Sequence, residues 1–285
     1  MKKFIIAAMA MLIAAPMVSL ASPESDLKKL QAHMFKKFPG VPLNEYGNGV
    51  YAIDKDRRVE WEAMEEFPPY EPAVDIGKKL FNKYKVAKCF PNKGIGIKQN
   101  YPMFKGGKVH TLEGDLMACL KKNGVDTKKE KLKYGKGKFA AIAAYMAYTS
   151  RGKKTNVKVP AGAATKIYNQ GKRFFYAKRG QLNFSCADCH VYNPGVMLRT
   201  MKLSPALGQT SHFPVYRKKW QGGGGNPELS GLGTVQRRYG GCNKMVRAKP
   251  LKPKDGKQHP DYVALEYFHT YMSNGIAINA PGVRQ

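Results

Sequence analysis

Three residues close together in the sequence have the spacing of a haem-attachment site. The stretch FSCADCHVY contains Cys186, Cys189 and His190 as C-x-x-C-H. Two thiols at this spacing can reach the two vinyl groups of a haem, and the histidine that follows then lies under the iron as an axial ligand. A zinc site would need a second pair of ligands, and a disulfide redox site would not need the histidine. The motif therefore predicts one covalently bound haem c.

The chain has five cysteines, so three remain to be explained. Cys89 and Cys119 lie upstream of the haem motif, and Cys242 lies downstream of it. A disulfide between the first two would close a loop of about 30 residues and stabilise the fold by roughly 3 to 4 kcal/mol in the chain-entropy model. The alternative is two buried free thiols, which are less common in an oxidising compartment. We predict the disulfide, which leaves Cys242 without a partner.

Cys242 is a candidate for the second axial ligand of the haem iron. It follows the haem motif at a separation that allows a loop to return it to the opposite face of the haem. Methionine is a common second ligand in cytochromes c, so other residues after the motif compete with it. These competitors are Met197, Met201, Met245, Met272, His212 and His259.

The residues that precede Cys242 favour a reactive sulfur. Arg237 and Arg238 place positive charge beside the thiol, which lowers its pKa, and Gly240 and Gly241 leave access to it. If the stretch is helical, Arg238 and Cys242 lie at i and i+4 on one face, so the guanidinium can hold an anion against the sulfur. The alternative is a solvated pair of arginines on a basic surface.

Two helices are expected to position the haem motif. The stretch TKIYNQGKRFFYAKRG precedes it, and its amphipathic spacing predicts a helix with Ile167, Phe174 and Phe175 facing a core. The stretch PDYVALEYFHTYMSNG, which begins at Pro260, predicts a closing helix. This order of elements outlines a cytochrome c domain, which we expect over residues 161–285.

The same order of elements occurs earlier in the chain without the haem motif. DIGKKLFNKYKVAKC parallels NQGKRFFYAKRGQLNFSC, and AYMAYTSRG parallels YFHTYMSNG, so that Gly77 matches Gly171 and Phe81 matches Phe175. The first copy has CFPNKG where haem attachment requires C-x-x-C-H. We therefore predict a mainly α protein with two cytochrome c-like domains, of which the first, over residues 71–160, is haemless and held by the disulfide. Chance similarity between two lysine-rich helices is the alternative.

The N-terminus has the pattern of an export signal. MKK is followed by a long apolar run and by SLA, so residues 1–21 are expected to be removed on export to an oxidising compartment. No later stretch reaches the roughly 18 consecutive apolar residues of a membrane-spanning helix, so no membrane span is expected. Residues 22–70 are expected to form an N-terminal extension that wraps the first domain or a partner protein.

The chain is strongly basic, with a formal net charge of +29. The lysines and arginines are spread along the whole sequence, without a compact basic block or an RNA-binding motif with interleaved aromatic residues. Nucleic acid is therefore not an expected partner. An acidic protein or an anionic substrate fits this charge better.

These features together resemble the SoxA family, the c-type cytochrome subunits of the bacterial thiosulfate-oxidising Sox system. The segments CFPNKGIGIKQNYPMF, GQTSHFPVYRKKW, GLGTVQRRYGGCNKMVRAKP, YVALEYF and SNGIAINAPGVRQ all look like family segments. Some members carry a second haem in the first domain. Because CFPNKG lacks that motif, the chain resembles the mono-haem branch.

The resemblance implies a periplasmic enzyme, an L-cysteine S-thiosulfotransferase. Members of the family pair with a SoxX cytochrome subunit and, in some cases, with a small accessory subunit. They conjugate thiosulfate oxidatively to a cysteine of the carrier SoxYZ and pass electrons to the partner haem. By resemblance, His190 and Cys242 would be the two axial haem ligands. Cys242 would also be the catalytic cysteine that becomes a persulfide, and Arg238 would bind the substrate.

Two other functions are compatible with the sequence. A plain periplasmic electron-transfer cytochrome c with a methionine or histidine as sixth ligand would keep its function without Cys242. A scaffold for a catalytic partner would keep turnover without Arg238. Replacing each residue by alanine therefore separates the three possibilities.

Overall fold

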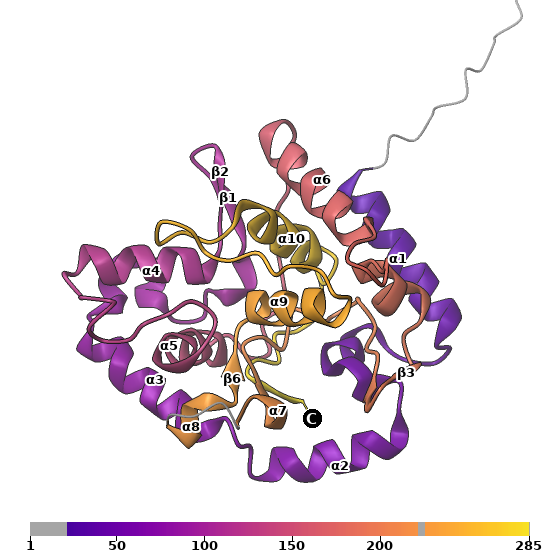
Figure 1. The fold of residues 1–285 in the computed structure, drawn as a ribbon, viewed down its shortest axis with the longest axis horizontal. Helices are drawn as coiled ribbons and strands as arrows, with labels where there is room; N and C mark the ends of the chain where they lie inside the picture. The colour runs from indigo at the N-terminus through magenta and orange to yellow at the C-terminus, as the bar shows by residue number, and fades with distance from the viewer. Residues whose placement is uncertain (1–21, 222–225, 285) are drawn as a thin grey trace, which may run out of the picture.

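The computed structural model describes residues 22–221 and 226–284, and they fold into a mainly helical structure (Figure 1). This confirms the prediction of a mainly α protein. The predicted export signal, residues 1–21, lies outside the described residues. Helices of ten residues or more are α1 (Pro23–Lys37), α2 (Lys55–Glu66), α3 (Glu71–Lys83), α4 (Leu112–Lys122), α5 (Gly137–Tyr148), α6 (Ala163–Tyr176), α9 (Val235–Met245) and α10 (Pro260–Tyr271), together with the 3-10 segment η1 (Leu43–Ala52).

Shorter elements connect these helices. The short helical turns are η2 (Val86–Cys89), η3 (Pro91–Gly94), η4 (Lys98–Asn100), η5 (Asp188–Tyr192), α7 (Lys218–Gln221) and α8 (Pro227–Ser230). The strands are β1 (Met103–Lys105), β2 (Lys108–His110), β3 (Met197–Leu198), β4 (Met201–Lys202), β5 (Val215–Arg217), β6 (Leu232–Gly233) and β7 (Gly282–Arg284).

Two pairs of helices cross at a glycine, one pair in residues 71–160, here called the first half, and one in residues 161–285, the second half. In the first half, a Cβ atom at Gly77 of α3 would lie 2.1 Å from the carbonyl oxygen of Ala141 in α5. In the second half, a Cβ atom at Gly171 of α6 would lie 2.0 Å from the carbonyl oxygen of Ala264 in α10. Both crossings therefore need a residue without a side chain.

The closing helices α5 and α10 also end alike. Gly152 and Gly275 follow them with φ angles of 80° and 85°, the left-handed conformation that glycine adopts at helix ends. The preceding serines, Ser150 and Ser273, are both fully buried. The closing helix of the second half begins at Pro260, as the sequence predicted.

The core of the first half surrounds the predicted disulfide. Cys89 at the end of η2 and Cys119 in α4 are bonded, with their Cα atoms 5.7 Å apart, which confirms the prediction. Phe81, Leu116 and Leu120 are buried in the same cluster. The crosslink thus joins two segments that already share a hydrophobic core.

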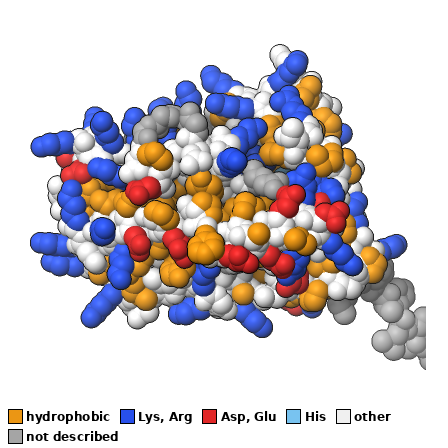
Figure 2. Space-filling view, turned by 90° about the horizontal axis from the view of Figure 1, so that it is seen from below, with side chains coloured by type: hydrophobic (Ala, Val, Ile, Leu, Met, Phe, Trp, Pro, Cys, Tyr) orange, Lys and Arg blue, Asp and Glu red, His pale blue; other side chains and the backbone are white. Residues whose placement is uncertain are grey.

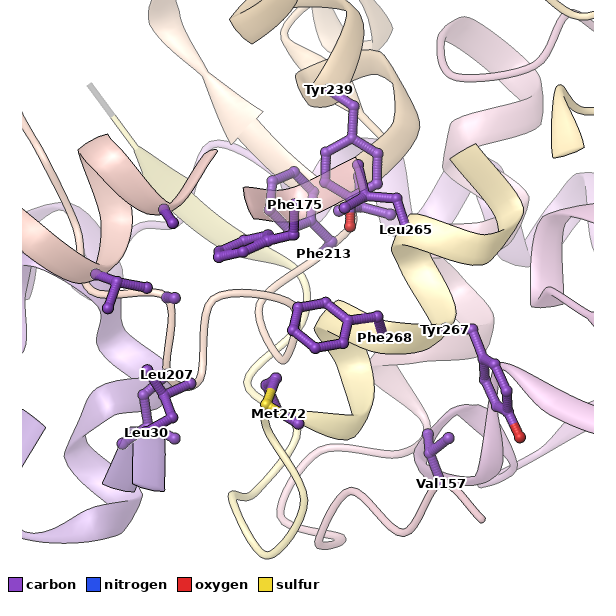
Figure 3. Packing of buried hydrophobic residues seen from close by; sticks show 14 of the residues in the cluster. Leu30, Val157, Phe175, Leu207, Phe213, Tyr239, Leu265, Tyr267, Phe268 and Met272 are labelled. Atoms are coloured by element: carbon purple, nitrogen blue, oxygen red, sulfur yellow. The ribbon is translucent and has the colours of Figure 1, made fainter. Parts of the chain in front are cut away.

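The core of the second half lies between α6 and α10. Phe175 from α6 and Leu265 and Phe268 from α10 point toward one another (Figure 3), and the exposed fractions of Phe175 and Phe268 are 2% and 1%. Ile167 and Phe174 pack against this cluster from the same helix. The predicted core-facing side of the helix is therefore confirmed.

The N-terminal extension, which was expected to wrap the first domain or a partner protein, packs against both halves of the described chain. Leu30 and Met34 of α1 are buried in the same cluster as Phe175, and α1 lies beside α6 (Figure 1). Lys172 of α6 forms an ion pair of 2.6 Å with Asp26 of α1. The extension has its own amphipathic helix, and that helix packs against the nearest unoccupied apolar surface.

A small sheet, which the sequence did not predict, brings the end of the described chain back into the molecule. Strand β5 pairs with β6 in antiparallel and with β7 in parallel orientation. These strands have two or three residues, too few for an alternating pattern to be recognised. The parallel pairing places Arg284 directly opposite Arg217.

The surface is basic over most of the side shown in Figure 2, on which α2 lies. Lysine and arginine side chains are scattered across it, and carboxylates gather in a row across its middle. Exposed carboxylates of α2 include Asp56, Glu60, Glu62 and Glu66. Among the described residues, no helix combines the length and the apolar composition needed to cross a membrane.

Candidate active site

The haem-attachment motif lies at a short helical segment whose second part, Asp188–Tyr192, is a π-helical turn, and local hydrogen bonds hold it in place. The carboxylate of Asp188 accepts hydrogen bonds of 2.8 Å from both the backbone N–H and the hydroxyl of Ser185. These bonds satisfy donors at the start of the turn, as a helix cap does. Cys186 and Cys189 therefore share one wall of a cavity with His190.

The ring of His190 is oriented by the backbone. Its Nδ1 lies 2.8 Å from the carbonyl oxygen of Ser204. A carbonyl can only accept, so Nδ1 carries the hydrogen and Nε2 keeps a free lone pair. This is the tautomer that a metal-binding histidine needs, and the carbonyl fixes the direction of the ring.

The cavity beside the motif is lined mostly by apolar side chains and contains every cysteine outside the disulfide. Cys242 of α9 lines the same cavity as the motif. The aromatic lining residues come from four separate places in the second half. They are the adjacent pair Phe174 and Phe175, then Phe184, Phe213 and Tyr239.

Cys242 and Arg238 lie on the same face of a helix, as the sequence predicted. Helix α9 runs from Val235 to Met245, and both side chains line the cavity. Helix α9 is anchored on α10, because Asn243, which also lines the cavity, donates a hydrogen bond of 2.8 Å to the hydroxyl of Tyr262. Helix packing thus decides which residues of α9 face the cavity.

The two glycines before Cys242 are not required by packing within the chain. A Cβ atom at Gly240 would come no closer than 3.7 Å to Pro250, and one at Gly241 no closer than 3.9 Å to Arg238. Each glycine in a helix interior costs about 1 kcal/mol relative to alanine. The space that they leave is therefore available to something other than the chain.

The three free thiols of the cavity differ in acidity. Burial raises the pKa of Cys186 to about 12, and it also raises the pKa of Cys189. Burial acts in the same direction on Cys242, but the positive charge of Arg238, with smaller contributions from His190 and Arg217, outweighs it and lowers the pKa to about 7. Cys242 is the thiol of this group that ionises most easily.

Arg237 does not act as predicted. Its guanidinium stacks on Trp220 at 4.2 Å and donates a hydrogen bond of 2.7 Å to the carbonyl oxygen of Leu232. Arg237 is not among the residues that line the cavity, whereas Arg238 is. Of the two arginines, Arg238 lies beside the sulfur.

Of the alternative haem ligands, Met245 lines the cavity, one helical turn after Cys242. Met201 and His212 line an adjoining cavity, where Arg217 and Arg284 respectively contact them. The remaining candidates are part of the core, on the surface or at a helix end. These are Met272, Met197 and His259.

Several basic residues near the site were missed by the sequence analysis. Arg57, Lys202, Arg217 and Arg284 line the adjoining cavity, whose volume is about 320 Å³. They come from four distant parts of the chain, and no local motif connects them. Their positions depend on the pairing of β5 with β7 and on the packing of the N-terminal extension.

Known proteins resemble this chain over almost its whole length. A protein named L-cysteine S-thiosulfotransferase subunit SoxA from Allochromatium vinosum is 45% identical over 277 residues, 94% of this chain and 92% of the relative. One of the same name from Chlorobaculum tepidum is 45% identical and covers 92% of this chain and 88% of itself.

A solved structure is similar as well. The crystal structure of SoxXA from P. pantotrophus aligns with a TM-score of 0.65 at 27% identity, covering 80% of this chain and 84% of its own. No protein-family model matches the chain. The fold and the sequence similarity therefore agree.

Proposed function

The chain belongs to the SoxA family of L-cysteine S-thiosulfotransferase subunits, and on that premise we propose that it joins thiosulfate to a cysteine of a SoxYZ-type carrier as the catalytic subunit of a SoxXA-type complex. The observation that carries the proposal is the position of Cys242. Its sulfur faces His190 in one cavity, and Arg238 lies one helical turn away on the same face. A SoxX-type cytochrome and, in some complexes, a small accessory subunit are the proposed partners, and the periplasm is the proposed location.

The residues of the cavity fit one haem c. Cys186 and Cys189 would hold the haem covalently, and His190, with a lone pair on Nε2, and Cys242 would be its ligands, since all four line one cavity. The apolar aromatic lining suits a porphyrin. A bound haem c supplies a centre that exchanges electrons one at a time.

The chain's own residues then have defined tasks in the reaction. Arg238 binds the thiosulfate dianion and stabilises the Cys242 thiolate. The sulfur of Cys242, or the outer sulfur of its persulfide, forms a bond to the sulfane sulfur of thiosulfate, and two electrons leave to the cytochrome partner. The carrier thiolate next attacks that sulfane sulfur, so the S-thiosulfonate passes to the carrier and the starting form of Cys242, thiolate or persulfide anion, is restored.

The first half is proposed to be a second cytochrome c-like domain without haem. The crossing of α3 with α5 at Gly77 and that of α6 with α10 at Gly171 support this proposal. The disulfide between Cys89 and Cys119 takes part in the core of the first half. The proposed boundary lies near residue 160, just before α6.

The test uses the haem-loaded protein assembled with its cytochrome partner and carrier. We expect Cys242→Ala to lower kcat by about a thousandfold, because the bond-forming sulfur is lost. We expect Arg238→Ala to raise KM for thiosulfate by about tenfold or more, because a charge-assisted contact to the anion is lost. Full activity of Cys242→Ala would show that the proposed mechanism is wrong.

A plain electron-transfer cytochrome is the second candidate, because Met245 lines the same cavity. In that case Met245→Leu would alter the visible spectrum of the haem and Cys242→Ala would not. If Cys242 is the ligand, the reverse holds, and Met245→Leu serves as the matched control. A scaffold role predicts that Arg238→Ala leaves turnover unchanged.

A further inference from the structure

A second cavity adjoins the one that contains Cys242. The two share His190, Gln209, Phe213 and Arg238 among their lining residues, so Arg238 stands at the boundary between them. The second cavity has a volume of about 320 Å³. The second cavity is therefore large enough to hold a small anion close to Arg238, the arginine that lies beside Cys242.

The lining of this second cavity carries positive charge with no carboxylate among its described residues. Lys202 forms an ion pair of 2.6 Å with Asp54, which lies behind the lining, and the same carboxylate is 3.6 Å from Arg57. That carboxylate balances part of the charge. The full set of cations is Arg57, Lys202, Arg217, Lys219, Arg238 and Arg284.

Two of these cations are buried side by side. Arg217 of β5 and Arg284 of β7 are direct partners in the strand register, and their exposed fractions are 7% and 9%. Like charges directly opposite each other on paired strands are destabilising. Burial, as the main cause, lowers the pKa of Arg217 to about 9 and that of Arg284 to about 10. Glu65 acts on Arg284 and Cys242 acts on Arg217 in the opposite direction, and each offsets part of this effect.

The contacts of Arg284 within the described chain are all to neutral groups. Its Nη2 lies 3.0 Å from Nδ1 of His212, its Nη1 donates a hydrogen bond of 2.6 Å to the carbonyl oxygen of Val283, and its guanidinium stacks on Tyr51 at 4.9 Å. Burial lowers the pKa of His212, so this histidine is a neutral acceptor. No ion pair with a described carboxylate is formed by Arg284.

Resting on the proposed function, we propose that this second cavity is an oxyanion-binding subsite, with Arg284 as its principal charged donor and Arg217 beside it. Guanidinium groups bind carboxylate, sulfonate and phosphate oxygens through paired hydrogen bonds. Two sources of such oxygens lie within reach of this site. They are the sulfonate end of thiosulfate, whose sulfane sulfur would then point past Arg238 toward Cys242, and a propionate of the haem.

The subsite explains the role of the last described strand. Strand β7 has three residues and forms the edge of a small sheet. Its pairing with β5 delivers Arg284 to the wall of the cavity. The segment therefore takes part in ligand binding as well as in packing.

The experiment measures anion binding to the haem-loaded full chain. Sulfate is the unreactive probe and thiosulfate the substrate probe, and both dissociation constants are determined by calorimetry at constant ionic strength. We expect Arg284→Gln to weaken binding by about tenfold or more, and Arg284→Lys to retain part of it. Lys218→Gln, which removes an exposed charge outside the cavity, is the matched control and should leave the constants unchanged.

A redox titration of the same variants separates the two sources. If the subsite holds thiosulfate, Arg284→Gln weakens thiosulfate binding and leaves the midpoint potential of the haem unchanged. If it holds a propionate, Arg284→Gln shifts the midpoint potential and leaves the anion constants unchanged. If Arg284→Gln matches Lys218→Gln in both measurements, there is no oxyanion subsite.

A measurement on the unmodified protein covers the case in which Arg284→Gln does not fold. A sulfonate subsite predicts that sulfate raises the melting temperature above that in chloride of equal ionic strength. A propionate ligand predicts that the melting temperature rises more on haem attachment in the unmodified protein than in Arg284→Lys. Absence of both effects would overturn the proposal. Turnover by Cys242→Ala tests the proposed function separately, because these readouts do not depend on catalysis.

Discussion

The two halves of the molecule share a helix crossing but differ in what lies beside it. Counted back from Gly152 and Gly275, Ala141 and Ala264 occupy the same position, and each receives a glycine of the partner helix. In the same alignment, Ala143 and Met146 of α5 correspond to Glu266 and His269 of α10. Both halves therefore share this helix pair. The second half, which contains the cavity with Cys242, differs in having polar residues at these two positions of its closing helix.

The difference extends to the cysteines. In the first half, two cysteines are bonded to each other within a closed apolar core. In the second half, three free cysteines line a cavity. Cysteine therefore stabilises the first half as a disulfide and is available for chemistry as a free thiol in the second half. The difference is whether a second cysteine lies within bonding distance.

The largest expected effect concerns the disulfide. We expect Cys89→Ser to destabilise the first half by roughly 3 to 4 kcal/mol, because the unfolded chain regains the entropy of the open loop. The measurement is chemical unfolding followed by circular dichroism, with the visible haem spectrum recorded in parallel. We expect the visible haem spectrum to remain unchanged at denaturant concentrations at which the circular dichroism signal from the helices of the first half has already been lost. Loss of both signals together would show that the halves unfold as one unit.

The next effect tests whether the two crossings are equivalent. We expect Gly77→Ala and Gly171→Ala each to destabilise by about 3 kcal/mol, because a methyl group would overlap the opposing backbone. Gly106→Ala is a suitable control, because a Cβ atom there meets nothing within 4 Å, although its φ of +57° makes a small cost expected. Thermal unfolding measures all three. If only one of Gly77→Ala and Gly171→Ala lowered the melting temperature, the two helix crossings would not be equivalent.

The smallest expected effect concerns the buried acid of α10. Burial, together with the nearby Glu113, raises the pKa of Glu266 to about 8 from 4.5. Between these pH values the folded protein binds a proton at Glu266 that the unfolded chain does not. The contribution of Glu266 to stability is therefore complete below about pH 4.5 and is lost as the pH rises toward 8. Glu266→Gln should flatten the dependence of stability on pH in this window. An unchanged slope would show that Glu266 does not titrate there.

Much of the frame was predictable because its signals are local. The C-x-x-C-H spacing, the glycine and phenylalanine pair of each helix, and the proline that opens α10 can each be recognised within one short segment. The disulfide followed from counting, because two cysteines had no other task. The helical phase of Arg238 and Cys242 followed from their spacing of four residues.

Other features were not predictable because they depend on contacts between distant segments. Arg237 was expected beside the sulfur, yet Trp220 and the carbonyl of Leu232 hold it elsewhere. The extension was expected to wrap the first domain or a partner protein, and no local pattern indicated that the apolar side of α1 is buried with residues of the second half. In both cases the competing partner lies outside the local pattern, so spacing alone could not identify it.

Three features can be recognised in the sequence alone. They are a haem-attachment motif, a lone downstream cysteine with an arginine one helical turn away, and a paired set of helices. Covalent spacing and helix periodicity are local properties, so they can be read along the chain. Which charged side chains become neighbours depends on the tertiary structure. Arg217 and Arg284 are far apart in sequence, and the pairing of β5 with β7 places them side by side at the cavity.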